Sequence, residues 1–356
     1  MRTSFEDAGG RTLHRRAHRK ADGRMLYLYG VAPHEGEALP EEAGAVAKGG
    51  ELRFHPLRAE WNLYAAHRQD RTFKPAAADD PLAPSAPGRP ATEIPFEAFD
   101  LAIFENKFTS LHPDAPPPGA VPGVETARAA GACEVVVYTP AREGSLATVG
   151  QDRRRLLLAA WCDRYAGLRG PEVPFVYPFE SRGDEVGVTL HHPHGQIYAF
   201  PFVPGVQARA AAAFAAGYAL HRALTEQEDL IVAEAGGIAA WCPPYARFPF
   251  ECWLVPRRRV PGPWAFTAEE ADGFAHLLGE VTRRYDAYFE RPTAYMLTLH
   301  AAPWGTDDHW HFTAQFYPIL RAPGRVKYLA SVEQGTGAFT VDVMPDRAAA
   351  TLRSLA

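Results

Sequence analysis

One histidine-rich stretch near the middle of the chain constrains its fold and chemistry more than any other. It reads His-His-Pro-His-Gly-Gln-Ile-Tyr over residues 191–198 and follows a strand-like segment, residues 185–190. In a strand, alternate side chains share a face, so His192 and His194 would point the same way and Gln196 would follow on that face. We therefore expect two imidazoles and a carboxamide to line one pocket.

These residue types suit nucleophilic attack on a phosphate. Histidine is the side chain that is both unprotonated and nucleophilic near neutral pH without extensive tuning of its pKa. Gln196 could donate its amide hydrogens to a phosphate oxygen that gains negative charge in the transition state. Gly195 would let a phosphate approach the backbone closely. His-x-His is also a common metal-ligand spacing, and a histidine cluster can be a hydrogen-bonded surface patch. The Gly-Gln continuation favours phosphate chemistry.

The composition is that of an ordinary globular chain. The 356 residues are 47% hydrophobic and 22% charged, which by length corresponds to about two lobes. A net charge of −5 creates no basic field, so nucleic acid is not expected as a partner. No apolar run reaches the length of a membrane span, and the N-terminal residues 1–5 precede charges rather than an apolar signal core. We expect a cytoplasmic protein without a membrane partner. The four cysteines are scattered, which argues against a disulfide framework or a thiolate zinc site.

The segment His192–Tyr198 resembles the signature of the galactose-1-phosphate uridylyltransferase family, which belongs to the histidine-triad superfamily. In that family the second histidine of His-Pro-His attacks the α phosphorus of UDP-glucose. A uridylylated histidine forms, glucose 1-phosphate leaves, and galactose 1-phosphate then takes the uridylyl group. The resemblance implies that His194 is the nucleophile, that Gln196 is the oxyanion donor and that His192 belongs to the catalytic group.

The resemblance extends to other segments and implies further binding residues. An Arg-x-x-Arg pair, an Asn-x-Phe turn, two positions before the signature and the glycine within it would contact the nucleotide and its phosphates. These residues are Arg68, Arg71, Asn106, Ser181, Thr189 and Gly195. Ser181 stands where the family more often has asparagine. A tail segment similar to the family's Lys-Phe-x-x-x-x-Glu would contact the sugar phosphate through Lys327, Tyr328, Val332 and Glu333.

The departures from the family fall on metal ligands. At the first metal site two cysteines correspond to Asp80 and Ala83 and a histidine corresponds to Arg142, which leaves only His192. At the second site a glutamate corresponds to Ala210 and two histidines correspond to Thr313 and Gln315, which leaves only His300. Zinc needs about four donors. We therefore predict a chain without a metal cofactor, in which the zinc and iron sites of relatives are lost, and an Arg142–Asp80 pair is one candidate to offset the first loss.

The order of predicted elements indicates an internal duplication. A strand, a helix, a strand and a histidine-containing strand that ends in an aromatic residue and proline occur twice, with helices expected over 151–167, 207–225 and 268–289. We expect an α+β fold of two fused histidine-triad-like halves, with antiparallel sheets flanked by helices. The halves would span residues 51–205, which carry the His-Pro-His-Gly-Gln run, and 206–356, a degenerate copy. Residues 1–50 would form an irregular extension that could hold one strand or hairpin.

The resulting functional hypothesis is a ping-pong nucleotidyltransferase that moves UMP between a UDP-hexose and a sugar 1-phosphate. Its partners would be these two substrates and a second copy of the chain, because family members are typically homodimers with sites at the subunit boundary. The acceptor stays open between galactose 1-phosphate and another phosphorylated sugar, and the base of the donor is equally open. A nucleotide phosphorylase or hydrolase and a non-catalytic nucleotide binder are the other classes. The intact His194 and Gln196 argue against the non-catalytic binder.

Overall fold

A single antiparallel sheet organises the molecule. The computed structural model spans residues 1–356 and describes all of them except 71–78 and 90. The sheet has twelve strands in the order β1-β2-β3-β6-β8-β10-β9-β14-β15-β13-β12-β11. Its strands are β1 (Arg2–Glu6), β2 (Thr12–Arg19), β3 (Met25–Gly30), β6 (Leu101–Glu105), β8 (Ala132–Val137), β9 (Phe175–Arg182), β10 (His194–Phe200), β11 (Ile231–Ala235), β12 (Ile238–Trp241), β13 (Cys252–Pro256), β14 (Tyr295–His300) and β15 (Thr313–Pro318). The predicted α+β fold with an antiparallel sheet and flanking helices is confirmed.

The strand order is nearly symmetric about the junction of β9 and β14. On one side β9 pairs with β10 and β10 with β8, and on the other β14 pairs with β15 and β15 with β13. Helix α1 (Gln151–Leu168) precedes β9, just as α4 (Ala268–Phe289) precedes β14. This arrangement matches the repeat of elements expected from the sequence. The two copies nevertheless share one continuous sheet and one main hydrophobic core.

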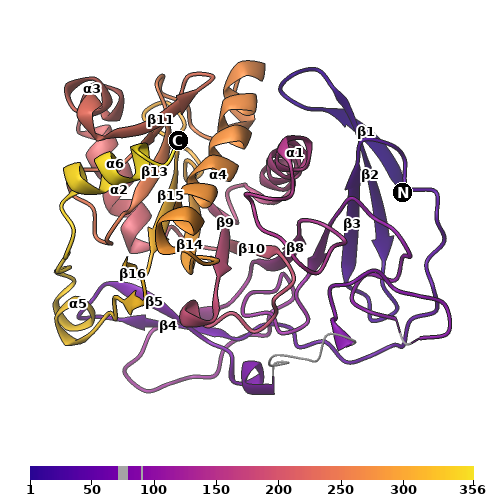
Figure 1. The fold of residues 1–356 in the computed structure, drawn as a ribbon. Helices are drawn as coiled ribbons and strands as arrows, with labels where there is room; N and C mark the ends of the chain where they lie inside the picture. Colours follow the sequence, from indigo (N-terminus) through magenta and orange to yellow (C-terminus); the bar gives the residue numbers. More distant parts are fainter. Residues whose placement is uncertain (71–78, 90) are drawn as a thin grey trace.

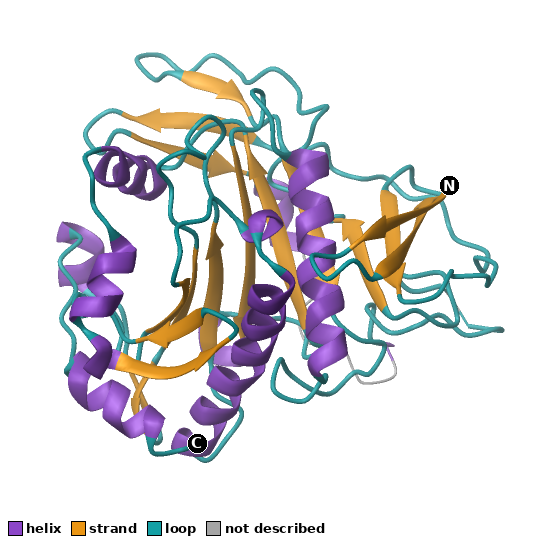
Figure 2. Cartoon of the chain, turned by 90° about the horizontal axis from the view of Figure 1, so that it is seen from above, coloured by secondary structure: helices purple, strands orange, loops and turns teal. Residues whose placement is uncertain are grey.

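Helices α1 and α4 cover one face of the sheet and lie against each other (Figures 1 and 2). The sequence explains α4 well, because Thr267 and Glu270 form a capping box at its start and its apolar residues recur on one face. Under these helices the inward side chains of β10 and β15, such as Ile197 and Phe316, are fully buried. The alternate side chains of the same strands therefore point to the opposite face, which carries the candidate site.

Smaller elements complete the fold. A second sheet has the order β5-β4-β7, and a two-stranded ribbon pairs β16 with β17. These strands are β4 (Glu51–His55), β5 (Glu60–Tyr64), β7 (Thr126–Arg128), β16 (Leu320–Ala322) and β17 (Arg325–Val326), and the other α-helices of the described residues are α2 (Gly205–Ala215), α3 (Leu220–Glu226), α5 (Ser331–Thr336) and α6 (Pro345–Arg353). None of the described helices is long and apolar enough to span a membrane.

Three sequence-based expectations about secondary structure are wrong. Residues 1–30 are not an irregular extension, since β1, β2 and β3 form a meander that joins the main sheet through β6, whereas residues 31–50 hold no helix or strand. Figure 1 shows this meander at one end of the molecule. The strand expected over 185–190 is replaced by a 3₁₀ turn at Asp184–Val186 followed by Gly187 in the left-handed conformation. The helix expected over 207–225 is two helices, interrupted at Gly217, whose φ is +95°.

Candidate active site

His194 is the first residue of β10, an inner strand that pairs with β8 on one side and β9 on the other. Its Nδ1 lies 2.7 Å from the carbonyl oxygen of His192. A carbonyl can only accept, so Nδ1 carries the proton and the lone pair is on Nε2. Burial lowers the pKa of His194, outweighing the hydrogen bond to the His192 carbonyl, which acts in the opposite direction. The imidazole is therefore neutral at neutral pH, with Nε2 as the nucleophilic atom.

His192 forms a buried ion pair with Asp80. Its Nδ1 lies 2.8 Å from Asp80 Oδ2, and its Nε2 lies 2.7 Å from the carbonyl oxygen of Thr139. His192 is 2% exposed and Asp80 is 8% exposed. Burial alone would raise the pKa of Asp80, but hydrogen bonds from His192 and from the Leu82 amide, with the charges of His192 and Arg142, hold it below its usual value. Asp80 is therefore a carboxylate, both ring nitrogens of His192 face acceptors, and both must carry protons.

Two expectations about His192 and its surroundings need correction. Strand β10 begins at His194, and His192 lies in the preceding bend, so the rule that alternate strand residues share a face does not apply to it. The proposed Arg142–Asp80 pair is also wrong, because Asp80 pairs with His192. Arg142 acts on Asp80 only through its charge, and its buried Nη1 has no hydrogen-bond partner among the described residues.

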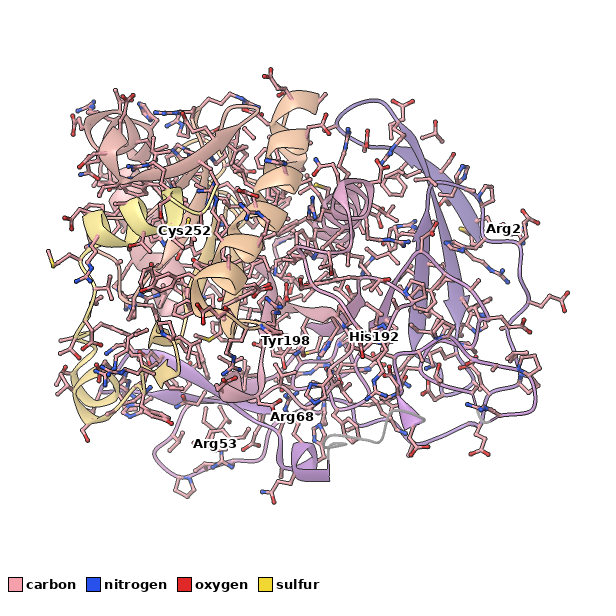
Figure 3. The ribbon with its side chains drawn as sticks, in the orientation of Figure 1. Arg2, Arg53, Arg68, His192, Tyr198 and Cys252 are labelled. Atoms are coloured by element: carbon pink, nitrogen blue, oxygen red, sulfur yellow. The ribbon has the colours of Figure 1, made fainter. Side chains whose placement is uncertain are left out.

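The structure brings Arg68 and Asn106 together beside β10. Arg68 lies in a 3₁₀ turn, Ala66–Asp70, and its Nη1 donates to the Phe108 carbonyl at 2.8 Å. Asn106 Oδ1 accepts from the Phe108 amide at 2.8 Å. Burial raises the pKa of the Tyr198 hydroxyl, and the charge of Arg68, which lies near this hydroxyl, acts in the opposite direction. Tyr198 projects from the same face of β10 as His194. Figure 3 shows Arg68, Tyr198 and His192 in one region of the molecule. Arg71, the second predicted arginine, lies outside the described residues.

Gly195 is required by packing on the helix side of the sheet. A Cβ at this position would lie 2.4 Å from the Tyr138 hydroxyl oxygen and 2.7 Å from the Phe179 carbonyl oxygen. Gln196 is half-buried on the face that carries His194. Ser181 pairs with Met296 across the β9–β14 junction, and Thr189 is half-buried in the loop before His192. Their predicted roles in nucleotide binding stay predictions.

The tail residues form a separate group. Lys327 and Glu333 are buried, and Lys327 Nζ lies 3.3 Å from Glu333 Oε1. Tyr328 and Val332 are 78% and 50% exposed. In the shared orientation of Figures 1 and 3, α5 lies well away from His192. One chain therefore does not bring these four residues to its own His194.

The positions that correspond to metal ligands in relatives do not form a metal site in the described part of the chain. No group of three or more His, Cys, Asp or Glu side chains that could hold an ion occurs among the described residues. At the first position His192 uses both nitrogens in hydrogen bonds. At the second, Nδ1 of His300 lies 3.3 Å from Gln207 Nε2 and its Nε2 lies 2.9 Å from Thr298 Oγ1. Ala210, Thr313, Gln315 and His300 do line one cavity together, but with a single imidazole among them.

Asp80 is a site residue whose position the sequence identifies but whose role, binding His192, it does not. It was recognised as the replacement of a cysteine ligand, yet its partner is 112 residues away in the chain. The available signal was the chemistry of the replacement, since an acid that takes the place of a thiolate beside a retained histidine can bind that histidine directly.

A neutral imidazole held by the backbone carbonyl two residues earlier, on an inner strand and near an arginine, has the geometry that suits an enzyme acting on phosphate groups. Comparison with known proteins then identifies the family. Residues 46–204 match the model of the N-terminal domain of galactose-1-phosphate uridyl transferase, and residues 205–356 match the model of its C-terminal domain. The chain belongs to the galactose-1-phosphate uridylyltransferase family.

Individual relatives cover nearly the whole chain. A galactose-1-phosphate uridylyltransferase of Thermotoga maritima is 36% identical over 85% of this chain and 98% of that protein. One of Streptomyces lividans is 32% identical over 95% of this chain and 97% of its own length. Among solved structures, a uridylyltransferase superposes with a TM-score of 0.77 at 26% identity and covers 86% of this chain and 98% of that chain.

Proposed function

We propose that this chain moves UMP between a UDP-hexose and a sugar 1-phosphate through a uridylyl-His194 intermediate. The observation that carries the proposal is the state of His194, whose Nδ1 donates to the His192 carbonyl at 2.7 Å and whose Nε2 is left as the nucleophile. The family of the chain and the names of its relatives support this reaction and its substrates.

The reaction balances without a metal or a net proton transfer. The Nε2 lone pair attacks the α phosphorus of the UDP-hexose, the bond from that phosphorus to the bridging oxygen breaks, and hexose 1-phosphate leaves with the electron pair. A phosphate oxygen of the second sugar 1-phosphate then attacks the same phosphorus, and the N–P bond breaks. The Gln196 amide donates to the phosphoryl oxygens that gain charge, and the Arg68 guanidinium offsets the negative diphosphate.

The tail segment supports a further proposal about assembly. Lys327, Tyr328, Val332 and Glu333 resemble the sugar-binding segment of the family, but the same chain does not present them to His194. The exposed Tyr328 and Val332 could complete the site of a second copy of the chain. We therefore propose a homodimer in which each tail contributes to the site of its partner. We also propose that the enzyme is cytoplasmic.

Isotope exchange tests the proposed reaction. With UDP-glucose and labelled glucose 1-phosphate as the only substrates, the label should enter UDP-glucose, because the first displacement is reversible in a ping-pong mechanism. Gln196→Ala should slow this exchange by about 10²-fold with a smaller effect on KM, as expected for a donor that acts in the transition state. Gln227→Ala, at the residue that follows α3 in the second half, is the matched control and should leave exchange unchanged.

The acceptor and the alternative activities are decided by the second half-reaction. After exchange is established, galactose 1-phosphate and other phosphorylated sugars are offered one at a time, and the product UDP-sugar identifies the acceptor. Release of free UMP without any acceptor would indicate a hydrolase. Formation of UDP when inorganic phosphate is offered as the acceptor would indicate a phosphorylase, because phosphate then takes the uridylyl group. No exchange with any nucleotide sugar would refute the proposal.

A further inference from the structure

The second half of the sheet carries a cavity on the face that also carries His194. Its volume is about 390 Å³, within the range of small-molecule sites. Helix α2 forms one wall, and outward side chains of β13, β14 and β15 form the floor, among them Trp253, His300 and Gln315. The proposed reaction uses none of these residues.

Aromatic rings form most of the remaining lining. Phe214 and Trp310 meet edge to face, with ring centroids 5.3 Å apart, and so do Tyr245 and Trp253 at 5.7 Å. The hydroxyl oxygens of Tyr218 and Tyr245 lie 2.9 Å apart, and these two tyrosines are 45% and 48% exposed. They therefore stand at the opening of the cavity. Such walls favour a flat ring that can stack or contact ring edges.

Two polar groups in the lining have no partner for some of their donors or acceptors among the described residues: the half-buried guanidinium of Arg247 and the buried Nδ1 of His311. The guanidinium of Arg247 lies over the rings of Tyr317 and Phe339, at 5.4 and 5.1 Å, and makes no ion pair or hydrogen bond with a described residue. His311 is 2% exposed, its Nε2 donates to the Pro256 carbonyl at 2.8 Å, and its Nδ1 has no partner in the described part of the chain. The cavity thus offers unused N–H donors on Arg247 and one unused acceptor on His311.

The remaining charges indicate that a neutral ring fits better than an ion. Glu251 also lines the cavity, but its carboxyl is committed to the Arg247 and Phe248 amides and to the Trp253 indole. An anion would face this carboxyl, and a cation would face Arg247.

We propose that this cavity binds a nucleobase, carried by a free nucleoside or by a nucleoside monophosphate. A nucleobase is planar and neutral and combines a carbonyl or ring nitrogen that accepts from Arg247 with an N–H that donates to His311. The ring would lie among Phe214, Trp253 and Trp310, and the ribose would face the opening at Tyr218 and Tyr245.

The cavity is positioned to influence the candidate active site. Strands β9 and β14 separate β15 from β10, so about three strand spacings, or roughly 14 Å, lie between the cavity floor and the catalytic strand. Aromatic contacts cross this interval, since Tyr177 of β9 lies 5.7 Å from His300 and is in ring contact with Phe179, which meets Tyr198 at 5.3 Å. These ring contacts connect the floor of the cavity with the strand that carries His194.

Binding of uridine and of adenosine, each with its 5′-monophosphate, tests the proposal on the full chain by calorimetry, without any turnover. Ala210→Leu fills the cavity from α2, and Ala208→Leu makes the same change on the exposed side of the same helix. At least one nucleoside should bind to the wild type, and Ala210→Leu should weaken this binding by at least tenfold while Ala208→Leu leaves it unchanged. His311→Phe and Arg247→Met, which remove the acceptor and the donors, should each weaken it several-fold.

The outcomes separate the cavity from the candidate active site. Tighter binding of the monophosphate than of the nucleoside, with both lost in Ala210→Leu, identifies the nucleotide as the ligand, and equal binding identifies the nucleoside. Binding that Ala210→Leu leaves intact would place the ligand elsewhere and overturn the proposal. Absence of saturable binding by all four compounds at millimolar concentration would overturn it as well. None of these results depends on whether the chain transfers UMP.

Discussion

The buried pair of Asp80 and His192 gives a prediction that separates charge from hydrogen bonding. In Asp80→Ala, His192 can lose its proton and keep the Nε2 bond to Thr139, but Nδ1 is then buried without a partner. Leaving a buried group unsatisfied costs about 1–3 kcal/mol, and breaking a buried ion pair costs about 3–5 kcal/mol. We expect Asp80→Ala to lower the free energy of unfolding by about 3 kcal/mol.

Asp80→Asn should be much milder. The asparagine carbonyl can still accept from the Leu82 amide, which lies 3.0 Å from Asp80 Oδ1, and its NH₂ can donate to Nδ1 of a neutral His192. We expect a loss of about 1 kcal/mol, typical of one exchanged hydrogen bond. Asp79 is the neighbouring exposed carboxylate, so Asp79→Ala and Asp79→Asn serve as matched controls and should change stability by less than about 0.5 kcal/mol.

Urea denaturation at pH 7 measures these differences, and ¹⁵N NMR of the histidine rings reports the protonation directly. Both ring nitrogens of His192 should carry hydrogen in the wild type and only one in Asp80→Asn. Because the His192 carbonyl holds His194 in place, Asp80→Ala should also slow UMP exchange, by up to about 10²-fold for a displacement near 1 Å. An Asp80→Ala variant as stable as Asp79→Ala, or a wild-type His192 with an unprotonated nitrogen at pH 7, would refute the reasoning.

Three further predictions concern the ionisation, packing and metal content of the same region. Burial raises the pKa of Glu180 to about 7, above its ordinary 4.5. The neutral form therefore contributes stability that is complete below about pH 4.5 and is lost as pH rises through about 7. The loss amounts to about 3 kcal/mol. Glu180→Gln should therefore gain about this much relative to wild type between pH 5 and pH 8 in urea denaturation, and an effect that is the same at both values would contradict the assignment. Gly195→Ala should lower the free energy of unfolding by about 1–3 kcal/mol, because the added Cβ would contact the Tyr138 hydroxyl. Tyr138→Phe in the same chain should recover part of that loss. No recovery would mean that the conflict lies with the Phe179 carbonyl alone. Elemental analysis of the purified chain should find far less than one zinc or iron per chain, and stoichiometric metal would show that the ligand replacements were misread.

The sequence predicted the regular, locally encoded elements well. Helix α4 begins and ends at the expected residues because its apolar spacing and the Thr267 cap both lie within the segment. The meander of β1 to β3 was missed because β2, with the sequence Thr-Leu-His-Arg-Arg-Ala-His-Arg, has few apolar residues, and its stability comes from pairing at the end of a sheet built elsewhere in the chain. The prediction of a strand over 185–190 was wrong because it rested on the alternating valines and gave too little weight to Gly187. This glycine takes a left-handed conformation, which a strand does not allow.

In the candidate site, too, local features could be predicted from the sequence and contacts between distant segments could not. The nature of His194 and its anchored tautomer follow from a contact between neighbours in the sequence, so they could be foreseen. The Asp80–His192 pair and the cluster of Arg68 with Tyr198 join segments more than a hundred residues apart, and spacing along the chain carries no information on such contacts. The aromatic cavity of the second half could not be predicted for this reason, although its lining includes the altered positions of the second metal site, Ala210, Thr313 and Gln315.

Intact-protein mass spectrometry after incubation with UDP-glucose tests the central claim most directly. The wild-type chain should gain the mass of one uridylyl group, the adduct should disappear when a sugar 1-phosphate acceptor is added, and His194→Gly should gain nothing. An adduct on His194→Gly, or none on the wild type with UDP-glucose or any other nucleotide sugar, would contradict a covalent mechanism at His194.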